Sequence, residues 1–169
     1  MGSVTFESEL IPVATPRQMV DTELLVGDRF FKVTCLSIGN PHCVIPLLEV
    51  SPEIAIAWGA KIENHPLFPQ RINVQFLKVI DRQNIQIEIW ERGAGYTLAS
   101  GSSSCAAASA ARKLGLVDDK VKVHMPGGEI DIEIEGDRVF MTGTVSPVAK
   151  GEFAQDFCHQ IINDKKYIP

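Results

Sequence analysis

The sequence predicts an α+β domain in which a mostly antiparallel sheet curls around a central, buried helix. Short alternating segments, separated by turn residues, are typical of strands. The connections between them are short, which favours antiparallel pairing. One helical run, 102–115, contains almost only alanine, serine and cysteine before Arg112, and a helix without a polar face is enclosed on most sides. A plain helix packed on one sheet face is the alternative that the pattern leaves open.

The strands are expected wherever alternating residues lie between turn signals. A hairpin is predicted around residues 81–84, because the segments on either side alternate and are joined by Asp-Arg-Gln-Asn. Near the end of the chain, a strictly alternating run is turned back by Gly136-Asp137. The expected strands are 30–38, 74–80, 85–90, 121–125, 129–135 and 138–142.

Two helices interrupt the strands. Residues 51–53, Ser-Pro-Glu, combine a hydroxyl cap, a first-turn proline and an acid near the positive end of the helix dipole. This helix is expected to end at Asn64, before a His-Pro pair. The small-residue helix follows a serine-rich start and is expected to stop at Gly115.

Composition and charge restrict the class of protein. The 169 residues are 45% hydrophobic and 22% charged, as in a globular fold, with a net charge of −5. No basic stripe appears, which argues against nucleic acid or an anionic membrane as a partner. The start carries neither a basic nor an apolar leader segment, so a cytoplasmic location is expected. The four cysteines lack zinc-site spacing and are predicted to be buried, reduced thiols.

The stretch 90–104 contains the residues most suited to binding. It joins a strand end to the start of the small-residue helix, whose first-turn amides are unpaired donors suited to a carboxylate. Glu91 can accept from an ammonium group, and Arg92 can bind a carboxylate with two hydrogen bonds. The stretch is neither a Walker loop nor a dinucleotide fingerprint. These residues suit an amino acid; the alternative is a capped helix after a glycine-rich turn, with an ordinary Glu91–Arg92 salt bridge.

Two other segments are weaker candidates. Residues 39–43 place an amide, an imidazole and a thiol close together, which is more often a turn beside a buried cysteine than a site. Asn73 lies at a strand start, where an edge or capping role is the default.

Taken together, these segments fall in an order that resembles diaminopimelate epimerase. The resemblance extends from Met1 to about Gly151, corresponds to the second half of that enzyme and implies strands wrapped around a central helix. The motifs, in chain order, are Gly-Asn-Pro-His-Cys at 39–43, Phe-Pro-Gln-Arg-Ile-Asn-Val-Gln-Phe at 68–76, Trp-Glu-Arg-Gly-Ala-Gly at 90–95, Ala-x-Gly at 99–101, Cys-Ala-Ala at 105–107 and Pro-Gly-Gly at 126–128.

The resemblance implies an epimerase that inverts an amino-acid α-carbon without pyridoxal phosphate or metal, using one cysteine from each half. By position, Ser100 occupies the place of the catalytic cysteine, and His42 and Glu91 would lie at the acid–base pair. The residues that would hold the substrate are Asn40, Asn73, Glu91 and Arg92, with the amides of Gly101 and Ser102 directed at its α-carboxylate.

Three departures from the family pattern bear on activity. A serine at position 100 is a much poorer base than a cysteine, whose reference pKa is about 8.5. Ser103 stands where the family usually has glycine and is expected to hinder backbone approach to the carboxylate. The half with the other catalytic thiol is missing, so this chain alone is expected to be inactive. Cys105 lies more than one turn inside the helix and is interpreted as structural.

The expected organisation is an epimerase-like domain at 1–151 and a tail at 152–169 that packs on the missing first half, in the same or a separate chain. The expected function is epimerisation of diaminopimelate, in lysine and cell-wall synthesis, with the small-molecule amino acid as ligand, no cofactor and a homo-oligomer left open. Two alternatives remain: a non-catalytic amino-acid-binding or assembly domain, and a related racemase or dehydratase acting on another amino acid.

Overall fold

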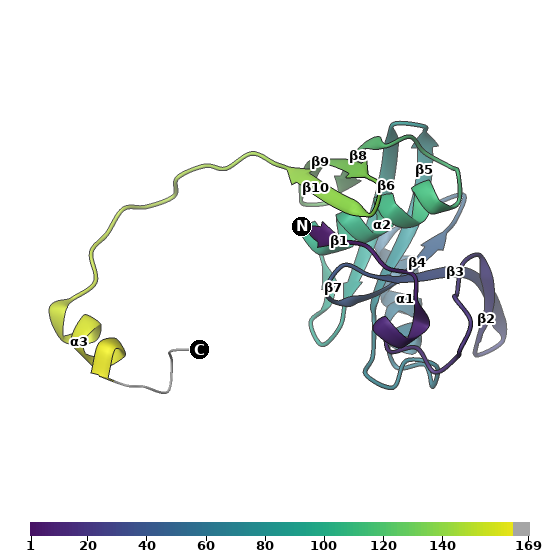
Figure 1. Cartoon of the computed structure of the whole chain (residues 1–169), viewed down its shortest axis with the longest axis horizontal. Helices are drawn as coiled ribbons and strands as arrows, with labels where there is room; N and C mark the ends of the chain where they lie inside the picture. The colour runs from purple at the N-terminus through teal and green to yellow at the C-terminus, as the bar shows by residue number, and fades with distance from the viewer. Residues whose placement is uncertain (164–169) are drawn as a thin grey trace.

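The structure is a computed structural model that describes residues 1–163 (Figure 1). Residues 164–169, the end of the predicted tail, lie outside the described residues. The elements in chain order are β1 Gly2–Ser3, a 3-10 turn Ser8–Leu10, β2 Thr22–Val26, β3 Arg29–Ser37, β4 Pro41–Pro46, α1 Pro52–Glu63, β5 Asn73–Asp81, β6 Asn84–Glu91, β7 Gly95–Thr97, α2 Gly101–Lys113, β8 Lys120–Met125, β9 Gly128–Glu135, β10 Arg138–Thr142 and α3 Gln155–Asn163.

The strands form one ten-stranded sheet that wraps around α2, as predicted. Its order is β1-β10-β9-β8-β6-β5-β4-β3-β2, with β7 paired to β6 off this path. The N-terminal segment joins the two ends of the wrapped region, because Val4 N donates to Asp137 O at 2.7 Å and Thr5 pairs with Ser37 of β3. Helix α2 contacts β3, β4, β5, β6, β8, β9 and β10. The alternative of a helix on one sheet face is therefore wrong.

The pairing is antiparallel except at two places. Strand β4 runs parallel to β5, and β6 runs parallel to β8. Each parallel pair is joined through a helix, α1 in the first case and α2 in the second, because a parallel connection needs a long crossover. The sequence pattern missed β4, since residues 39–43 were expected to be a turn. Only the first two of these residues turn, and Pro41 begins the strand, a position where the missing N–H is tolerated.

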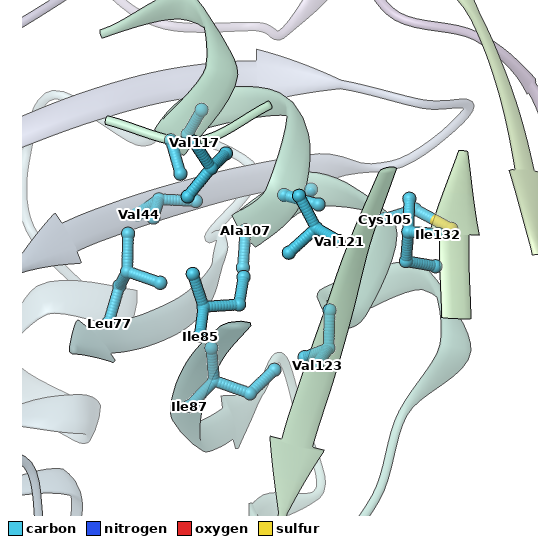
Figure 2. Close-up of a cluster of buried hydrophobic side chains, with 14 of the residues drawn as sticks. Val44, Leu77, Ile85, Ile87, Cys105, Ala107, Val117, Val121, Val123 and Ile132 are labelled. Carbon is cyan, nitrogen blue, oxygen red and sulfur yellow. The ribbon is translucent and has the colours of Figure 1, made fainter. Parts of the chain in front are cut away.

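Two hydrophobic cores lie on opposite faces of the shared strands. One surrounds α2, where Cys105 and Ala107 lie among isoleucine and valine side chains of the sheet (Figure 2). The other lies beneath α1. Side chains alternate between them along β4: Val44 belongs to the α2 core, whereas Ile45 belongs to the α1 core. Every residue of α2 from 103 to 111 is buried, so small side chains let the strands pack close to the helix backbone.

The helix signals match the sequence expectations, and three of the four cysteines are buried as predicted. Ser51 caps α1, its hydroxyl accepting from Ile54 N at 3.4 Å. Cys35, Cys43 and Cys105 are buried and unbridged, and Cys158 is half-buried. Among residues 1–163, none of the helices has the length and apolar composition needed to cross a membrane.

After β10, the chain leaves the wrapped sheet. Residues 143–154 form neither helix nor strand and are exposed, and α3 follows at their end, apart from the sheet in Figure 1. The predicted boundary between residues 151 and 152 falls inside this segment. The rings of Phe153 and Phe157 lie 5.3 Å apart on the exposed face of this region.

The enclosure of α2 predicts a strong cost for a larger side chain in its middle. Ala107→Leu should lower the free energy of unfolding by about 1–3 kcal/mol, because the buried helix has no room for three more carbons. Ala57→Leu, an identical change on the exposed side of α1, should alter it by less than about 0.5 kcal/mol. Urea unfolding followed by circular dichroism measures both. Equal effects of the two substitutions would contradict the enclosed position of α2.

Candidate functional site

Four elements bring their ends to the same place in the fold. Strands β4 and β5 both begin there, since they are parallel and His42 pairs in register with Asn73. Strand β6 ends there because it runs antiparallel to β5, with Val74 opposite Trp90. Helix α2 begins beside them, where Gln75 Nε2 and Ser103 Oγ lie 3.0 Å apart. Residues separated by up to about sixty positions in the sequence therefore share one edge of the sheet.

The alternation of the strands turns the polar residues toward α2. In β4, His42 lies two residues before Val44, which packs against α2. In β6, Glu91 lies two residues after Ile89, which also packs there, whereas Trp90 faces the α1 core. The eight residues singled out from the sequence are thus brought together at this edge. They are Asn40, His42, Asn73, Glu91, Arg92, Ser100, Gly101 and Ser102.

The start of α2 combines a capped first turn with two available amides. The Ser100 hydroxyl oxygen accepts from Ser103 N at 3.4 Å, and the Ser100 carbonyl accepts from Ser104 N at 3.0 Å. Within residues 1–163, the amides of Gly101 and Ser102 have no acceptor. Ser100 is therefore a helix cap, and the next two amides point partial positive charge out of the helix end.

Close packing shapes the surroundings of this helix start. A Cβ built at Gly101 would lie 2.8 Å from Met141 Sδ, so β10 packs against the backbone here. A Cβ at Gly127 would lie 2.9 Å from Leu98 O, the carbonyl that accepts from Gly127 N at 2.7 Å. The Pro-Gly-Gly turn thus supports the loop that leads into α2.

Asn73 ties the ends of the strands together. Its amide nitrogen donates to Pro41 O at 2.8 Å, and its amide oxygen accepts from Arg92 N at 2.9 Å. The side chain is buried, so both contacts are made away from solvent. Asn73 thus holds the segment that carries Asn40 next to the turn that carries Arg92.

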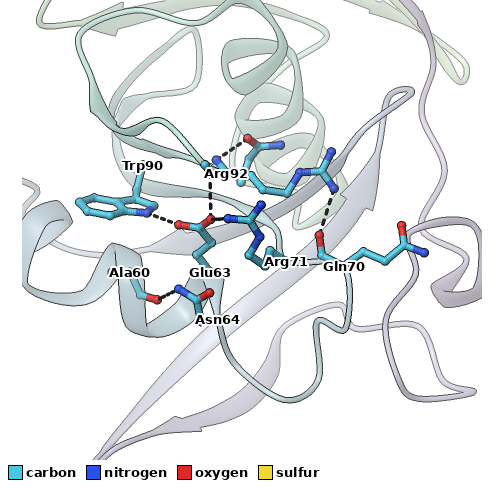
Figure 3. Close-up of polar contacts among 9 residues, drawn as sticks. Ala60, Glu63, Asn64, Gln70, Arg71, Trp90 and Arg92 are labelled. Atoms are coloured by element: carbon cyan, nitrogen blue, oxygen red, sulfur yellow. Dashed lines mark hydrogen bonds and ion pairs between the residues drawn. The ribbon is translucent and has the colours of Figure 1, made fainter.

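A buried carboxylate that the sequence did not reveal anchors the same turn from the other side. Glu63, the last residue of α1, accepts from Trp90 Nε1 at 2.7 Å, from Gly93 N at 2.9 Å and from Arg71 Nη1 at 3.1 Å (Figure 3). Its side chain is 6% exposed. Residues 91 and 92 lie in the chain between Trp90 and Gly93, and Glu63 holds both of these neighbours. No motif marks Glu63, because a glutamate in the last turn of a helix is normally solvated.

Glu91 and Arg92 do not form the salt bridge that was the alternative reading. Arg92 Nη1 donates to Gln70 O at 3.2 Å, and both side chains are half-buried. Within residues 1–163, no hydrogen bond or ion pair holds the Glu91 carboxylate. A guanidinium has five N–H donors, so Arg92 keeps several for a ligand. A carboxylate and a guanidinium are thus both available beside the helix start.

His42 is fully buried beside the half-buried Asn40. Its Nε2 lies 3.0 Å from Asn40 Oδ1. Burial lowers the pKa of His42 to about 4; a hydrogen bond with Gln75 raises it, and the positive charge of Arg92 lowers it further. The imidazole is therefore neutral near pH 7.

Two nearby groups are held away from acid–base chemistry. Burial raises the pKa of Cys105 to about 11, so this thiol stays protonated, in line with the structural role expected for it. Burial and a hydrogen bond to Glu88 raise the pKa of Tyr96 to about 12, and the Tyr96 hydroxyl donates to Glu88 Oε2 at 2.7 Å. The described residues contain no group of three histidine, cysteine or acidic side chains placed to bind a metal.

Known proteins of similar sequence point to one family. The family model described as diaminopimelate epimerase matches residues 34–148. The chain is 51% identical over 158 residues to "Diaminopimelate epimerase 2" of Nostoc sp., covering 92% of this chain and 55% of that protein. It is 44% identical over 153 residues to the diaminopimelate epimerase of Clostridium perfringens, again covering 55% of the relative. The chain thus spans about half the length of these relatives.

Among solved structures, a PhzF-family phenazine biosynthesis protein from Enterococcus faecalis superposes with a TM-score of 0.45 and 16% identity, over 58% of this chain and 35% of that one. This likeness is too low to carry an argument.

Removing the Glu63 charge should loosen the turn that carries Arg92. Glu63→Gln replaces one carboxylate oxygen by an NH₂ group that faces an N–H donor of Trp90 or Gly93. The free energy of unfolding should therefore fall by about 1–3 kcal/mol. The Gly93 amide resonance should shift at the same time. The exposed Glu23→Gln is the matched control and should stay within about 0.5 kcal/mol of the wild type. Urea unfolding measures the stability change, and amide NMR spectra measure the Gly93 shift. A Glu63→Gln protein as stable as the control would contradict the anchoring role.

The lowered pKa of His42 predicts an acid-dependent loss of stability. Between pH 6.5 and pH 4, the unfolded imidazole binds a proton that the folded one does not. Folding stability should therefore fall as the pH falls through this window, with a slope of at most about 1.4 kcal/mol per pH unit from this group.

The variant His42→Asn lacks the titrating group, so its unfolding free energy should fall less steeply across the same window. Chemical denaturation at several pH values compares the two slopes. Parallel slopes for wild type and variant would show that His42 is not the neutral, buried imidazole described.

Proposed function

The chain belongs to the diaminopimelate epimerase family, and we propose that it supplies half of a cofactor-independent amino-acid epimerase site whose substrate is diaminopimelate, interconverted between its LL and meso forms. The observation that carries the proposal is the meeting of Glu91, Arg92 and the free first-turn amides of α2 at one edge of the sheet. Such an epimerase serves lysine and cell-wall synthesis, and a cytoplasmic location fits the three buried, unbridged cysteines.

The available groups match the charges of an amino acid. The amides of Gly101 and Ser102 and the Arg92 guanidinium favour a carboxylate, while the Glu91 carboxylate favours an ammonium group. Diaminopimelate carries two carboxylates and two ammonium groups. A site with spaced N–H donors and one free carboxylate therefore suits diaminopimelate better than it suits a neutral ligand. Asn40 lies beside these groups and adds a neutral amide to the same edge.

Ser100 limits what this half can do in catalysis. Inversion of an α-carbon needs a base on one face and an acid on the other. The Ser100 oxygen already accepts from Ser103 N, and a serine hydroxyl does not ionise near neutral pH. A thiol at the same helix start would have its pKa lowered by the helix end. We therefore assign Ser100 the role of proton donor at most, and by itself the chain is expected to be inactive.

A partner half completes the proposal. The relatives are nearly twice as long as this chain, and the opposite face of the substrate would need a group from the rest of that length. Within the described part of the tail, Phe153, Phe157 and Ile161 are exposed. We propose that the tail, residues 152–169, packs on this partner half, whether it lies in the same chain or another.

One observation favours a second function, that of a non-catalytic amino-acid-binding domain. The Ser100 hydroxyl is used as a helix cap, while the groups that would bind the amino acid remain in place. Such a domain would bind diaminopimelate without moving its α-proton. Calorimetric titration combined with proton exchange separates binding from catalysis.

The test is α-proton exchange of diaminopimelate in D₂O, followed by NMR. The chain alone should give no exchange above the buffer rate. Combined with a separately produced first half of the Nostoc relative, the variant Ser100→Cys should exchange the α-proton at least 100-fold faster than the serine form, because a thiolate at the helix start is a far stronger base.

The matched control is Ser51→Cys, which places a thiol at the equivalent cap position of α1, outside the site. It should leave the exchange rate at the serine level. Enzyme-like exchange by the unmodified chain alone would contradict the proposal. So would equal rates for the two cysteine variants in an assembly that binds diaminopimelate.

A further inference from the structure

Two cysteines lie opposite each other in the pair of strands formed by β3 and β4. Cys35 of β3 pairs in register with Cys43 of β4. Both side chains are fully buried, and both belong to the core beneath α1. Cys105 lies in the α2 core on the opposite face of the shared strands, and Cys158 lies in α3. Within residues 1–163, Cys35 and Cys43 are therefore the one pair of cysteines placed to meet.

The backbone hydrogen bonds show which kind of cross-strand pair these two cysteines form. Cys35 N donates to Met19 O at 2.8 Å, a partner that precedes β2 and does not belong to β4. Successive N–H groups of a strand point to opposite sides, so the neighbours Thr34 and Leu36 direct theirs toward β4. Cys35 and Cys43 thus form a non-hydrogen-bonded pair, the kind in which opposite side chains lie closest together.

This pairing has the spacing that a disulfide needs. Opposite Cα atoms in a non-hydrogen-bonded pair are about 4.5 Å apart, and Cα atoms joined by a disulfide are usually about 4.4–6.8 Å apart. The adjacent Cys35 thiol, together with burial, raises the pKa of the Cys43 thiol well above its usual value. A bond between the two sulfur atoms can therefore form while the strands keep their present register.

We propose that Cys35 and Cys43 are a modification site, at which a low-molecular-weight disulfide such as oxidised glutathione forms a cross-strand disulfide in the folded chain. One cysteine sulfur attacks the glutathione disulfide, and the first glutathione leaves as a thiol. The second cysteine sulfur then attacks this mixed disulfide, and the second glutathione leaves. The two cysteines lose two electrons and two protons, and the two glutathiones gain them.

The bond ties β4 to β3 directly beside the candidate site. Cys43 follows His42 in β4, and neighbouring side chains of a strand face opposite ways. Cys43 therefore points into the α1 core, whereas His42 lies on the side of α2. Oxidation thus fixes the strand that carries His42 without adding an atom to the site. This inference goes beyond the proposed function, because it involves no amino-acid ligand.

Burial separates the rate of this reaction from its equilibrium. Both thiols are shielded in the closed pair of strands, so the first attack on glutathione needs a transient opening. Once the strands close, the fold holds the two sulfur atoms together. The folded state should therefore favour the disulfide at equilibrium, even where its formation is slow.

The experiment compares the stability of this disulfide in the folded and the unfolded chain. The full chain carries Cys158→Ala, which removes the half-buried thiol of α3. It is brought to equilibrium in glutathione buffers, starting from both the reduced and the oxidised form. Free thiols are then alkylated, and mass spectrometry is applied to the tryptic peptide 33–61, which contains both cysteines.

The equilibrium constant for closing the disulfide should be at least 10-fold larger in native buffer than in guanidinium chloride at about 6 M. By the same linkage, the thermal midpoint of the oxidised chain should lie about 5 °C or more above that of the reduced chain.

Cys43→Ala in the same background is the matched control. Its remaining thiols, Cys35 and Cys105, lie on opposite faces of the shared strands. In native buffer they should form no internal disulfide, and Cys35 should carry one glutathione at most. Cys35→Ala provides the reciprocal control and should behave in the same way.

Three results would overturn the proposal. They are a disulfide that is no more stable in the folded than in the unfolded chain, a lower thermal midpoint after oxidation, and a peptide 33–61 that carries two glutathiones in place of an internal bond. None of these readings uses diaminopimelate. A failed proton-exchange assay therefore leaves this inference standing, and an absent disulfide leaves the proposed function standing.

Discussion

The enclosure of α2 by the sheet is the constraint on which the rest of the structure depends. A helix of alanine, serine and cysteine can be surrounded by strands because its side chains are small on every face. Enclosure fixes the helix axis, and with it the direction of the amides at the first turn. The same strands that bury the helix end beside its start, so packing and binding geometry have one cause.

Around that helix start, buried anchors hold the groups that face a ligand. Asn73 joins the start of β4 to the backbone of Arg92, and Glu63 holds the residues on either side of the Glu91–Arg92 pair. The carboxylate and guanidinium themselves stay half-exposed. The site is therefore pre-organised by residues that are turned away from solvent, while the charges it offers remain available.

Much of this could be predicted from local sequence. The small-residue run predicted the enclosed helix, and Ser51 predicted the start of α1, since both signals depend on a few neighbouring residues. Strand β4, the two parallel pairs and Glu63 could not be predicted, because each depends on partners more than twenty residues away. The family resemblance assigns Asn73 to a ligand; the structure adds that both ends of its amide contact the protein, while the second N–H of the amide has no partner within residues 1–163.

The most direct test of the central claim is an amide NMR titration of the chain, assembled with its partner half, with diaminopimelate. The account predicts that the Gly101 and Ser102 amide signals move most, as they acquire a carboxylate acceptor, and that both saturate together. Saturable binding that leaves those two signals in place, while amides elsewhere move, would contradict a site at the start of the enclosed helix.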